Sequence, residues 1–256
     1  MKKLNTLFLI LTLSTGCSQE IVSSKYAESI NSNDLEDLLS VYSSDGFEGR
    51  QTGTKGDRTA ANFLRDFYIS NKIGPALNTI DYFQPYQLNL PGKMYTFNYS
   101  FPSTLRGYDR YAQGDNFVDT QNVASVIEGE IYPESYLIIT GHLDHVGING
   151  DEVYNGADDN GSGTVSILEI AQAFQEAVED GVRPKRSVVF LHVSGEEEGL
   201  LGSEYYVNNS LYPLENTFAT LNLDMIGRTD PNRGYEDEEY VYSIGSDRIS
   251  KELKKI

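Results

Sequence analysis

Three short apolar runs, each followed at once by ionisable side chains, constrain the fold of this chain more than any other feature of its sequence. The runs cover residues 136–140, 187–193 and 218–223. Their length and nearly continuous apolar character are typical of strands that are buried on both faces of a sheet. Residues 161–179, between the first two runs, place apolar side chains at the spacing of a helix. Strand, helix and strand in this order predict a parallel α/β sheet covered on both faces.

The N-terminal half of the chain predicts further elements around this unit. Helices are expected over residues 34–42, with Asp34 as the capping residue, and over residues 55–71. The glycine-rich segment 46–56 between them predicts an irregular connection. Three more runs have the composition of strands, and they cover residues 82–90, 94–101 and 122–127.

Ionisable side chains gather where the predicted parallel strands end. One pair follows the first apolar run, one carboxylate lies in the loop that enters the helix, a second pair follows the second run, and a carboxylate closes the third. In chain order these residues are His142, Asp144, Asp158, Glu196, Glu197 and Asp224. The carboxyl ends of parallel strands meet at one edge of a sheet, and that edge is where α/β proteins bind ligands. We therefore expect these side chains to lie close together.

A cluster of this kind predicts a bound metal ion. Carboxylates brought to one sheet edge repel one another unless a cation neutralises them. Taken singly, each residue has an ordinary explanation: His142 as a core or surface histidine, Asp158 as a helix cap, Glu196 and Glu197 as a solvated turn, and Asp224 as an exposed strand end. Their placement at every strand exit favours metal instead. Imidazole with carboxylates suits zinc best, manganese or cobalt could occupy the same set, and two ions could share a bridging ligand.

Four motifs over residues 45–228 closely resemble the co-catalytic di-zinc aminopeptidase family. This family includes bacterial leucyl aminopeptidase and aminopeptidase Y-like proteins, and glutamate carboxypeptidase and the transferrin receptor ectodomain are related to it. The motifs are Gly141-His-Leu-Asp-His-Val-Gly147, Gly156-Ala-Asp-Asp-Asn-Gly-Ser-Gly163, Ser194-Gly-Glu-Glu-Glu-Gly-Leu-Leu-Gly-Ser203 and Asn222-Leu-Asp-Met-Ile-Gly227. The segment Phe47-Glu-Gly-Arg-Gln-Thr-Gly-Thr54 also resembles the family's entry segment. The resemblance implies a three-layer αβα sandwich with a mainly parallel central sheet and antiparallel edge strands.

The resemblance also implies a set of metal ligands. His142 and Asp224 would bind one zinc ion, Glu197 would bind the other, and Asp158 would bridge both. Two zinc ions are expected in a complete chain. The family places one more histidine ligand downstream of the position of Asp224, whereas none of the three histidines of this sequence lies there. The sequence therefore predicts a C-terminally truncated member of the family rather than a degenerate one.

Two further carboxylates receive catalytic roles by the same resemblance. Glu196 would be the general base, which takes a proton from the attacking water and returns it to the leaving amine. Asp144 would accept the free ring N–H of His142 and so fix its tautomer. Glu198 is the rival of Glu196, but the following glycine-rich motif favours Glu196. Neighbouring positions receive no catalytic role: Asp159 and Asn160 would shape the loop that presents Asp158, His145 would line its own loop, and His192 would be structural.

The function expected from these residues is zinc-dependent exopeptidase activity on peptides, most specifically that of an aminopeptidase. Two alternatives stay open on the same fold. One is an acyltransferase of the glutaminyl cyclase kind, and the other is a binding protein without catalysis. The formal net charge of −18, with no basic stripe in the sequence, excludes nucleic acid as a partner.

The first 17 residues predict an export signal rather than part of the fold. Lys2 and Lys3 precede a short apolar run over residues 7–13, and small residues then lead to Cys17. Cys17 resembles the lipid-acceptor position of a bacterial lipoprotein, which would make a lipid the only contact with the membrane. We expect a polar spacer over residues 18–33, a single catalytic domain over 34–256, and a location in the cell envelope, lipid-anchored in the periplasm or at the outer membrane. Plain cleavage and secretion is the alternative.

Overall fold

The computed structural model describes residues 25–89, 117–230, 232 and 240–245. The predicted signal peptide with Cys17, residues 18–24 of the predicted spacer and the strand expected over residues 94–101 lie outside the described residues. Two residues from the middle of the predicted spacer contact the domain, because Lys25 Nζ lies 2.5 Å and Tyr26 Oη 2.9 Å from the Asp180 carboxylate. The last two residues of the predicted spacer, Ser32 and Asn33, belong to a helix of the domain. Among the described residues, none of the helices combines the length and the apolar character that a transmembrane span requires.

One mixed sheet of six strands forms the centre of the described part of the fold, in the order β1-β3-β7-β4-β8 with β2 also pairing with β3. Strand β4 runs parallel to β7 and to β8, and β3 runs antiparallel to β1, β2 and β7. The strands are β1 (Gly74–Pro75), β2 (Phe83–Asn89), β3 (Phe117–Ile127), β4 (Tyr132–His142), β7 (Arg186–Val193) and β8 (Thr217–Asn222). The three apolar runs of the sequence are thus the parallel part of the sheet, β7-β4-β8.

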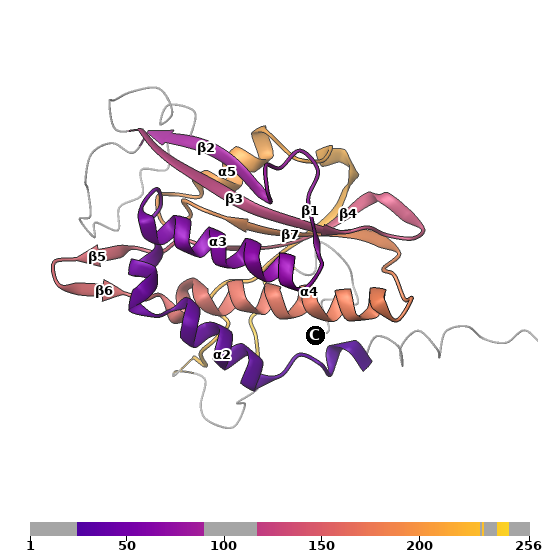
Figure 1. Cartoon of the computed structure of the whole chain (residues 1–256), viewed down its shortest axis with the longest axis horizontal. Coiled ribbons are helices and arrows are strands. Elements are labelled where there is room, and N and C mark those ends of the chain that lie inside the picture. Colours follow the sequence, from indigo (N-terminus) through magenta and orange to yellow (C-terminus); the bar gives the residue numbers. More distant parts are fainter. Residues whose placement is uncertain (1–24, 90–116, 231, 233–239, 246–256) are drawn as a thin grey trace, which may run out of the picture.

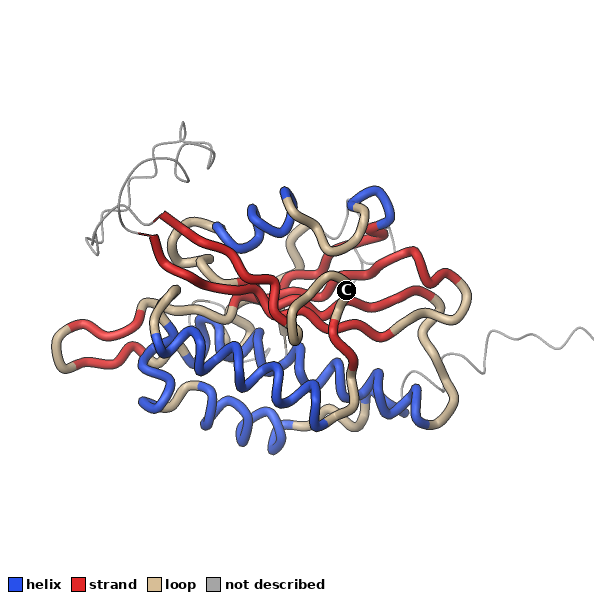
Figure 2. Tube along the Cα trace, turned by 45° about the horizontal axis from the view of Figure 1, so that its top comes forward, coloured by secondary structure: helices blue, strands red, loops and turns tan. Residues whose placement is uncertain are grey.

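Helices cover the two faces of this sheet unequally (Figures 1 and 2). Three helices lie on one face, and α5 lies on the other, where Tyr206 packs in a buried cluster with Ala124 and Leu191 of the sheet. The helices are α2 (Ser32–Tyr42), α3 (Lys55–Ser70), α4 (Gly163–Glu179) and α5 (Leu201–Asn208), with a short 3-10 segment η1 (Asp45–Arg50) before α3. The predicted α/β fold in three layers is confirmed.

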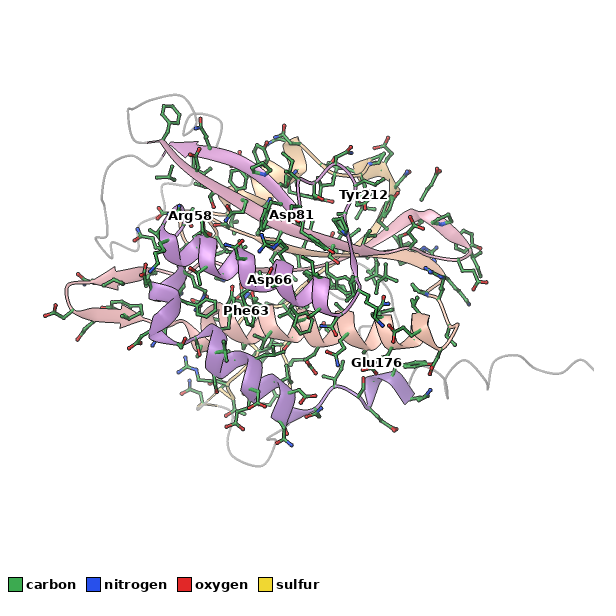
Figure 3. All side chains as sticks on the ribbon, in the orientation of Figure 1. Arg58, Phe63, Asp66, Asp81, Glu176 and Tyr212 are labelled. Carbon is green, nitrogen blue, oxygen red and sulfur yellow. The ribbon has the colours of Figure 1, made fainter. Side chains whose placement is uncertain are left out.

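The helix boundaries follow the local capping chemistry. Helix α2 begins earlier than predicted, because Asn31 and not Asp34 is the cap, and Asn31 Oδ1 accepts hydrogen bonds from the amides of Asn33 and Asp34, both at 3.1 Å. Helix α3 covers the predicted segment and presents Phe63 (Figure 3) to Tyr42 and Phe47, each with a ring-centroid distance of 5.6 Å. This aromatic contact joins α2, η1 and α3 into one layer.

The register of the parallel strands determines where the functional residues meet. Gly141 lies beside His192, and His142 lies beside Val193. On the other side of β4, Thr140 lies beside Asn222. The segments that follow all three strands therefore leave the sheet at one edge. The β5–β6 hairpin (Gly147–Asn149 and Glu152–Tyr154) extends from the body beyond the end of β4 (Figure 1).

His192 is a fully buried residue of β7, as expected for a structural histidine. Its Nε2 atom lies 2.7 Å from Tyr68 Oη, and its Nδ1 atom has no hydrogen-bond partner among the described residues. Burial lowers the pKa of His192 to about 3. In the unfolded chain a histidine has a pKa near 6.5. Between pH of about 6.5 and 3, His192 therefore binds a proton in the unfolded chain but stays neutral in the folded chain. This residue contributes stability above pH of about 6.5, and that stability is lost as the pH falls towards about 3.

We expect His192→Leu to flatten the acid side of the stability profile. Between pH 6 and 4 the free energy of unfolding of the parent should fall relative to that of the variant by about 1.4 kcal/mol per pH unit. Urea unfolding at a series of pH values measures this difference in slope, so a constant loss of packing in the variant does not matter. Tyr68→Phe is the control, because it removes the hydrogen bond and leaves the imidazole. Parallel profiles for the parent and His192→Leu would contradict the prediction.

Candidate metal centre

His142, the last residue of β4, is held in a fixed orientation at the edge of the sheet. It is buried, and Thr164 Oγ1 donates a 2.7 Å hydrogen bond to its backbone carbonyl. Its Nδ1 atom lies 3.1 Å from the backbone carbonyl oxygen of Asp144. A carbonyl oxygen can only accept, so Nδ1 carries a hydrogen, and Nε2, which faces Asp159 and Asp224, is the nitrogen that could bind a metal ion once it is deprotonated.

The carboxylate of Asp144 has a different partner from the one predicted. It lies 3.7 Å from His142 Nδ1, whereas the Asp144 backbone carbonyl makes the closer contact. The carboxylate instead accepts hydrogen bonds from the amides of Glu196 at 3.2 Å and Glu197 at 3.4 Å, and from Thr52 Oγ1 at 2.9 Å. Asp144 is fully buried, and it fixes the turn after β7 in addition to its 3.7 Å contact with the imidazole of His142. It is a positioning residue for two glutamates.

A first cluster of potential ligands contains His142, Asp159 and Asp224, whose ligand atoms all lie within 4.8 Å of one another. His142 Nε2 lies 3.1 Å from Asp159 Oδ1 and 3.8 Å from Asp224 Oδ1. Burial lowers the pKa of His142, but its contacts with Asp144, Asp159 and Asp224 outweigh burial and raise this pKa to about 12. The side chains of Asp159 and Asp224 are 38% and 37% exposed, so solvent can reach the two carboxylates beside the imidazole.

The structure places Asp159 in the cluster and Asp158 outside it, which differs from the predicted bridging role of Asp158. Asp158 Oδ1 accepts a 2.9 Å hydrogen bond from the amide of Gly227, and its Oδ2 lies 2.9 Å from Arg228 Nε. Ser162 Oγ also donates to the backbone carbonyl of Asp158 at 2.7 Å. The Asp158 carboxylate therefore joins its loop to the segment that follows β8, while Asp159 points to His142.

Asn160 fixes the loop that carries Asp224. Its Nδ2 donates to the Leu223 carbonyl at 2.9 Å, and its Oδ1 accepts from the amides of Met225 at 3.3 Å and Gly163 at 3.1 Å. The amide side chain thus holds the residues on both sides of Asp224. The peptide bond between Asp159 and Asn160 in this loop is cis.

A second cluster shares Asp159 with the first and adds His145 and Glu197, again with ligand atoms within 4.8 Å of one another. His145 Nδ1 lies 2.6 Å from Glu197 Oε1. Both side chains are largely buried, at 14% and 22% exposure. The sequence predicted Glu197 as a metal ligand but indicated no role for His145. The position of His145, three residues after His142 on the same loop, was a signal that could have pointed to its place in the cluster.

Glu196 lies beside these clusters without belonging to either of those found among the described residues. Partial burial raises the pKa of its carboxyl; His142 opposes this, and the carboxylates of Asp144, Glu197 and Asp224 add to it. A carboxylate with a raised pKa next to potential metal ligands is suited to proton transfer. The turn therefore places Glu197 in the second cluster and the adjacent Glu196 outside both clusters.

Arg50 is a fully buried cation that joins the two loops of the site, and sequence reasoning missed it. Its Nε donates to the Leu143 carbonyl at 3.1 Å. Its Nη1 donates to the Asn155 carbonyl at 2.6 Å, and its Nη2 donates to the Gly156 carbonyl at 2.8 Å. The guanidinium therefore fixes the loop after β4 against the loop that leads to Asp159.

Comparison with known sequences gives the family. The sequence profile of "Peptidase family M28" matches residues 122–256, more than half of the chain. Leupeptin-inactivating enzyme 1 of Streptomyces exfoliatus is 42% identical over 105 residues, which are 40% of this chain and 22% of that protein. A probable zinc metalloprotease of Pyricularia oryzae is 31% identical over 127 residues, which are 48% of this chain and 24% of that protein. The chain thus spans about a quarter of the length of these relatives.

Solved structures share the fold at lower sequence identity. An aminopeptidase from Aneurinibacillus sp. strain AM-1 superposes with a TM-score of 0.59 at 14% identity, over 81% of this chain and 73% of that one. A Zn-dependent exopeptidase from Parabacteroides distasonis superposes with a TM-score of 0.55 at 16% identity, over 78% of this chain and 63% of that one. These structures agree with the three-layer fold, and the family predicted from the four motifs is confirmed. The chain belongs to peptidase family M28.

Proposed function

We propose that this chain is a zinc-dependent exopeptidase and, within that class, an aminopeptidase. The observation that carries the proposal is the position of Asp159, which lies in two ligand clusters at once and could bridge two ions. The relatives add support, because a matching protein of Pyricularia oryzae is described as a probable zinc metalloprotease. The residues also fit zinc chemically, since each cluster combines one imidazole with carboxylates.

Each residue of the site has a defined task in this proposal. His142, Asp159 and Asp224 would hold one zinc ion, and Asp159 and Glu197 would hold the second. Zinc, when bound, polarises the scissile carbonyl and lowers the pKa of the attacking water towards about 7. Glu196 takes a proton from that water as its oxygen bonds to the carbonyl carbon, and gives it to the amine as the C–N bond breaks.

The overall charge of the chain favours an aminopeptidase over a carboxypeptidase. The chain carries a formal net charge of −18, of which bound zinc ions would neutralise only the ligand carboxylates of Asp159, Glu197 and Asp224. Such a field attracts the protonated α-amino group of a peptide and repels its terminal carboxylate. A relative from Mus musculus is named an aminopeptidase, and it is 34% identical over 108 residues, which are 41% of this chain and 14% of that protein. The proposed substrates are therefore peptides with a free N-terminus.

Hydrolysis of aminoacyl p-nitroanilides before and after metal removal tests this function. We expect 1,10-phenanthroline followed by dialysis to lower the rate at least about 100-fold, because the Lewis acid is removed, and added zinc to restore it. An N-acetylated substrate is the control, and it should not be cleaved. Equal cleavage of both substrates would contradict the aminopeptidase proposal. Ammonia release from N-terminal glutamine without peptide cleavage would support the glutaminyl cyclase hypothesis instead.

A further inference from the structure

Asp57, in the first turn of α3, is a fully buried carboxyl group that the proposed mechanism does not use. We propose that Asp57 is held as a neutral carboxylic acid, and that its proton completes a ring of hydrogen bonds which fixes the turn carrying Glu196 and Glu197. Asp57 is then a positioning residue for the general base. The consequence for catalysis rests on the proposed function, whereas the protonation state and its effect on the turn can be tested without it.

Four oxygen atoms of Asp57, Thr120 and Ser194 form a closed ring. Asp57 Oδ1 lies 2.8 Å from Ser194 Oγ, Ser194 Oγ lies 3.0 Å from Thr120 Oγ1, and Thr120 Oγ1 lies 2.8 Å from Asp57 Oδ2. Thr120 is on β3 and Ser194 directly follows β7, so the ring joins three segments that are distant in the sequence. Both hydroxyl residues are buried, as Asp57 is. These oxygen atoms therefore bind one another away from solvent.

The three contacts of this ring need three hydrogens, because each has the length of an O–H···O hydrogen bond. The two hydroxyl groups supply only two. If Asp57 were an anion, one pair of buried oxygen atoms would face each other with no hydrogen between them. In the neutral acid, Asp57 Oδ1 donates to Ser194, Ser194 donates to Thr120, and Thr120 donates to Asp57 Oδ2. The third hydrogen therefore belongs to Asp57.

Two further donors to Asp57 are compatible with the neutral acid. The amide of Gly53 donates to Asp57 Oδ2 at 3.0 Å, and Gln121 Nε2 donates to the same atom at 3.4 Å. This atom is the carbonyl oxygen of the acid, so neither donor competes with the proton on Oδ1. Burial raises the pKa of Asp57 to about 7; the hydrogen bonds from the two hydroxyl groups and from Gly53 oppose this, and the charge of Asp144 adds to it. The direction of this shift agrees with the number of hydrogens that the ring needs.

In the described part of the chain, no basic side chain forms an ion pair with Asp57. The titratable groups on the surrounding elements are Tyr42 on α2, Glu48 and Arg50 on η1, Lys55 and Arg58 on α3, Tyr86 on β2, Asp119 on β3, and Asp144, Glu196 and Glu197 on the loops after β4 and β7. The three cations of this set bind other groups. Arg50 donates to backbone carbonyls of the site loops, Arg58 donates to that of Gly53, and Lys55 pairs with the glutamate of η1. A buried anion at Asp57 would therefore have no neutralising partner.

Ser194 begins the turn that carries the general base. Its hydroxyl belongs to the ring, and its amide and carbonyl are bound by side chains of β3 and β2. Asp144 holds the later part of the turn through the amides of Glu196 and Glu197. Asp57 and Asp144 thus fix the two ends of one turn. Loss of the proton from Asp57 removes one hydrogen from the ring and loosens the end at Ser194.

Urea unfolding of the parent and of Asp57→Asn over a series of pH values tests the protonation state without any use of activity. The asparagine amide has an N–H donor in place of the proton and does not titrate. In the unfolded chain an aspartate has a pKa near 3.9, so the folded parent binds one more proton between pH of about 3.9 and 7. The stability that this proton contributes is fully present below pH of about 3.9 and is lost as the pH rises to about 7.

Between pH 5 and 6.5, the equilibrium constant for unfolding of the parent should therefore rise about tenfold per pH unit relative to that of Asp57→Asn. A constant change of packing in the variant does not affect this slope. Parallel profiles for the two proteins would show that Asp57 is ionised in the folded chain, and the proposal would be wrong.

Thr120→Val tests the effect of the ring on the turn, because valine keeps the shape of the side chain and removes one hydroxyl. At pH 6, the amides of Glu196 and Glu197 should exchange with deuterium about 3–10-fold faster in this variant than in the parent, the equivalent of one hydrogen bond. Nuclear magnetic resonance measures both rates, and thermal unfolding verifies that the variant is folded. Unchanged exchange of these amides would overturn the positioning role of the ring.

The pH profile of kcat for an aminoacyl p-nitroanilide extends the test to catalysis. From pH 6 to 8.5, kcat of the parent should fall about 3–10-fold relative to kcat of Asp57→Asn, while the ratio of the KM values stays constant. A constant ratio of kcat in an active enzyme would contradict a role of the Asp57 proton in positioning Glu196. A parent that shows the predicted unfolding slope and exchange rates but cleaves no peptide would contradict the proposed function and support the assignment of Asp57.

Discussion

Replacing Glu196 with alanine should lower kcat for an aminoacyl p-nitroanilide by about 10²–10⁴-fold, the contribution of a positioned general base. Glu196 is the carboxylate that lies beside both ligand clusters but in neither of them, and partial burial raises its pKa. Its loss should therefore remove proton transfer and leave the metal sites occupied. Steady-state kinetics and zinc content, measured on the same preparation, show the two effects separately.

Glu198 provides the matched control for this experiment. It lies in the same acidic run and is the sequence-level rival of Glu196. Glu198→Ala should keep most of the activity. Full activity in a zinc-loaded Glu196→Ala variant would overturn the mechanism, and loss of activity only in Glu198→Ala would transfer the role of base to that residue.

Asp159→Asn should reduce zinc affinity at both positions, by more than the roughly 10–100-fold that is typical when a residue supporting a metal ligand is changed. The reason is that Asp159 is the one carboxylate common to the two clusters of the described residues. Because both ions depend on it, hydrolysis should fall with the zinc content. Competition of the variant with a zinc-binding dye measures the affinity, and plasma mass spectrometry measures the number of ions.

The neighbouring Asp158→Asn variant makes this prediction discriminating. Its amide oxygen can still accept the hydrogen bond from the Gly227 amide. The ion pair that it loses involves Arg228, whose side chain is 74% exposed, and an exposed pair of this kind contributes about 0–1 kcal/mol. Zinc binding should therefore persist in Asp158→Asn. The reverse result, with zinc lost in Asp158→Asn and kept in Asp159→Asn, would show that the arrangement of these two carboxylates described above is wrong.

The sequence could not predict which of Asp158 and Asp159 faces His142. The predicted parallel strands and the helices over residues 55–71 and 161–179 correspond to β4, β7, β8, α3 and α4, since apolar periodicity reports burial directly. Two adjacent carboxylates in a glycine-rich loop carry no such signal. Which one faces His142 depends on backbone dihedral angles and on Asn160, whose partner Leu223 lies 63 positions away. Motif spacing located the loop but not the side chain.

The role of Asp144 was missed for a related reason. Sequence proximity suggested a bond to His142, two residues away, and the structure makes that bond with the backbone carbonyl of Asp144. The carboxylate is used for Glu196 and Glu197, 52 and 53 positions further on. Contacts at such separation are set by the register of β4 and β7, which no local pattern specifies.

The contacts of Arg50 and Thr52 have a consequence for how this protein can be divided. The family profile begins at residue 122, so both residues precede the profile match, although they lie in the segment over residues 47–54 that resembles the family's entry segment. Yet Arg50 pairs with the carbonyls of Leu143, Asn155 and Gly156, and Thr52 pairs with the buried carboxylate of Asp144. A fragment cut at the boundary of sequence similarity would leave these buried acceptors without donors, at a cost of about 1–3 kcal/mol each. The region that the family profile matches is therefore smaller than the folded unit that builds the site, and transfer of this site to another scaffold would require its N-terminal segment as well.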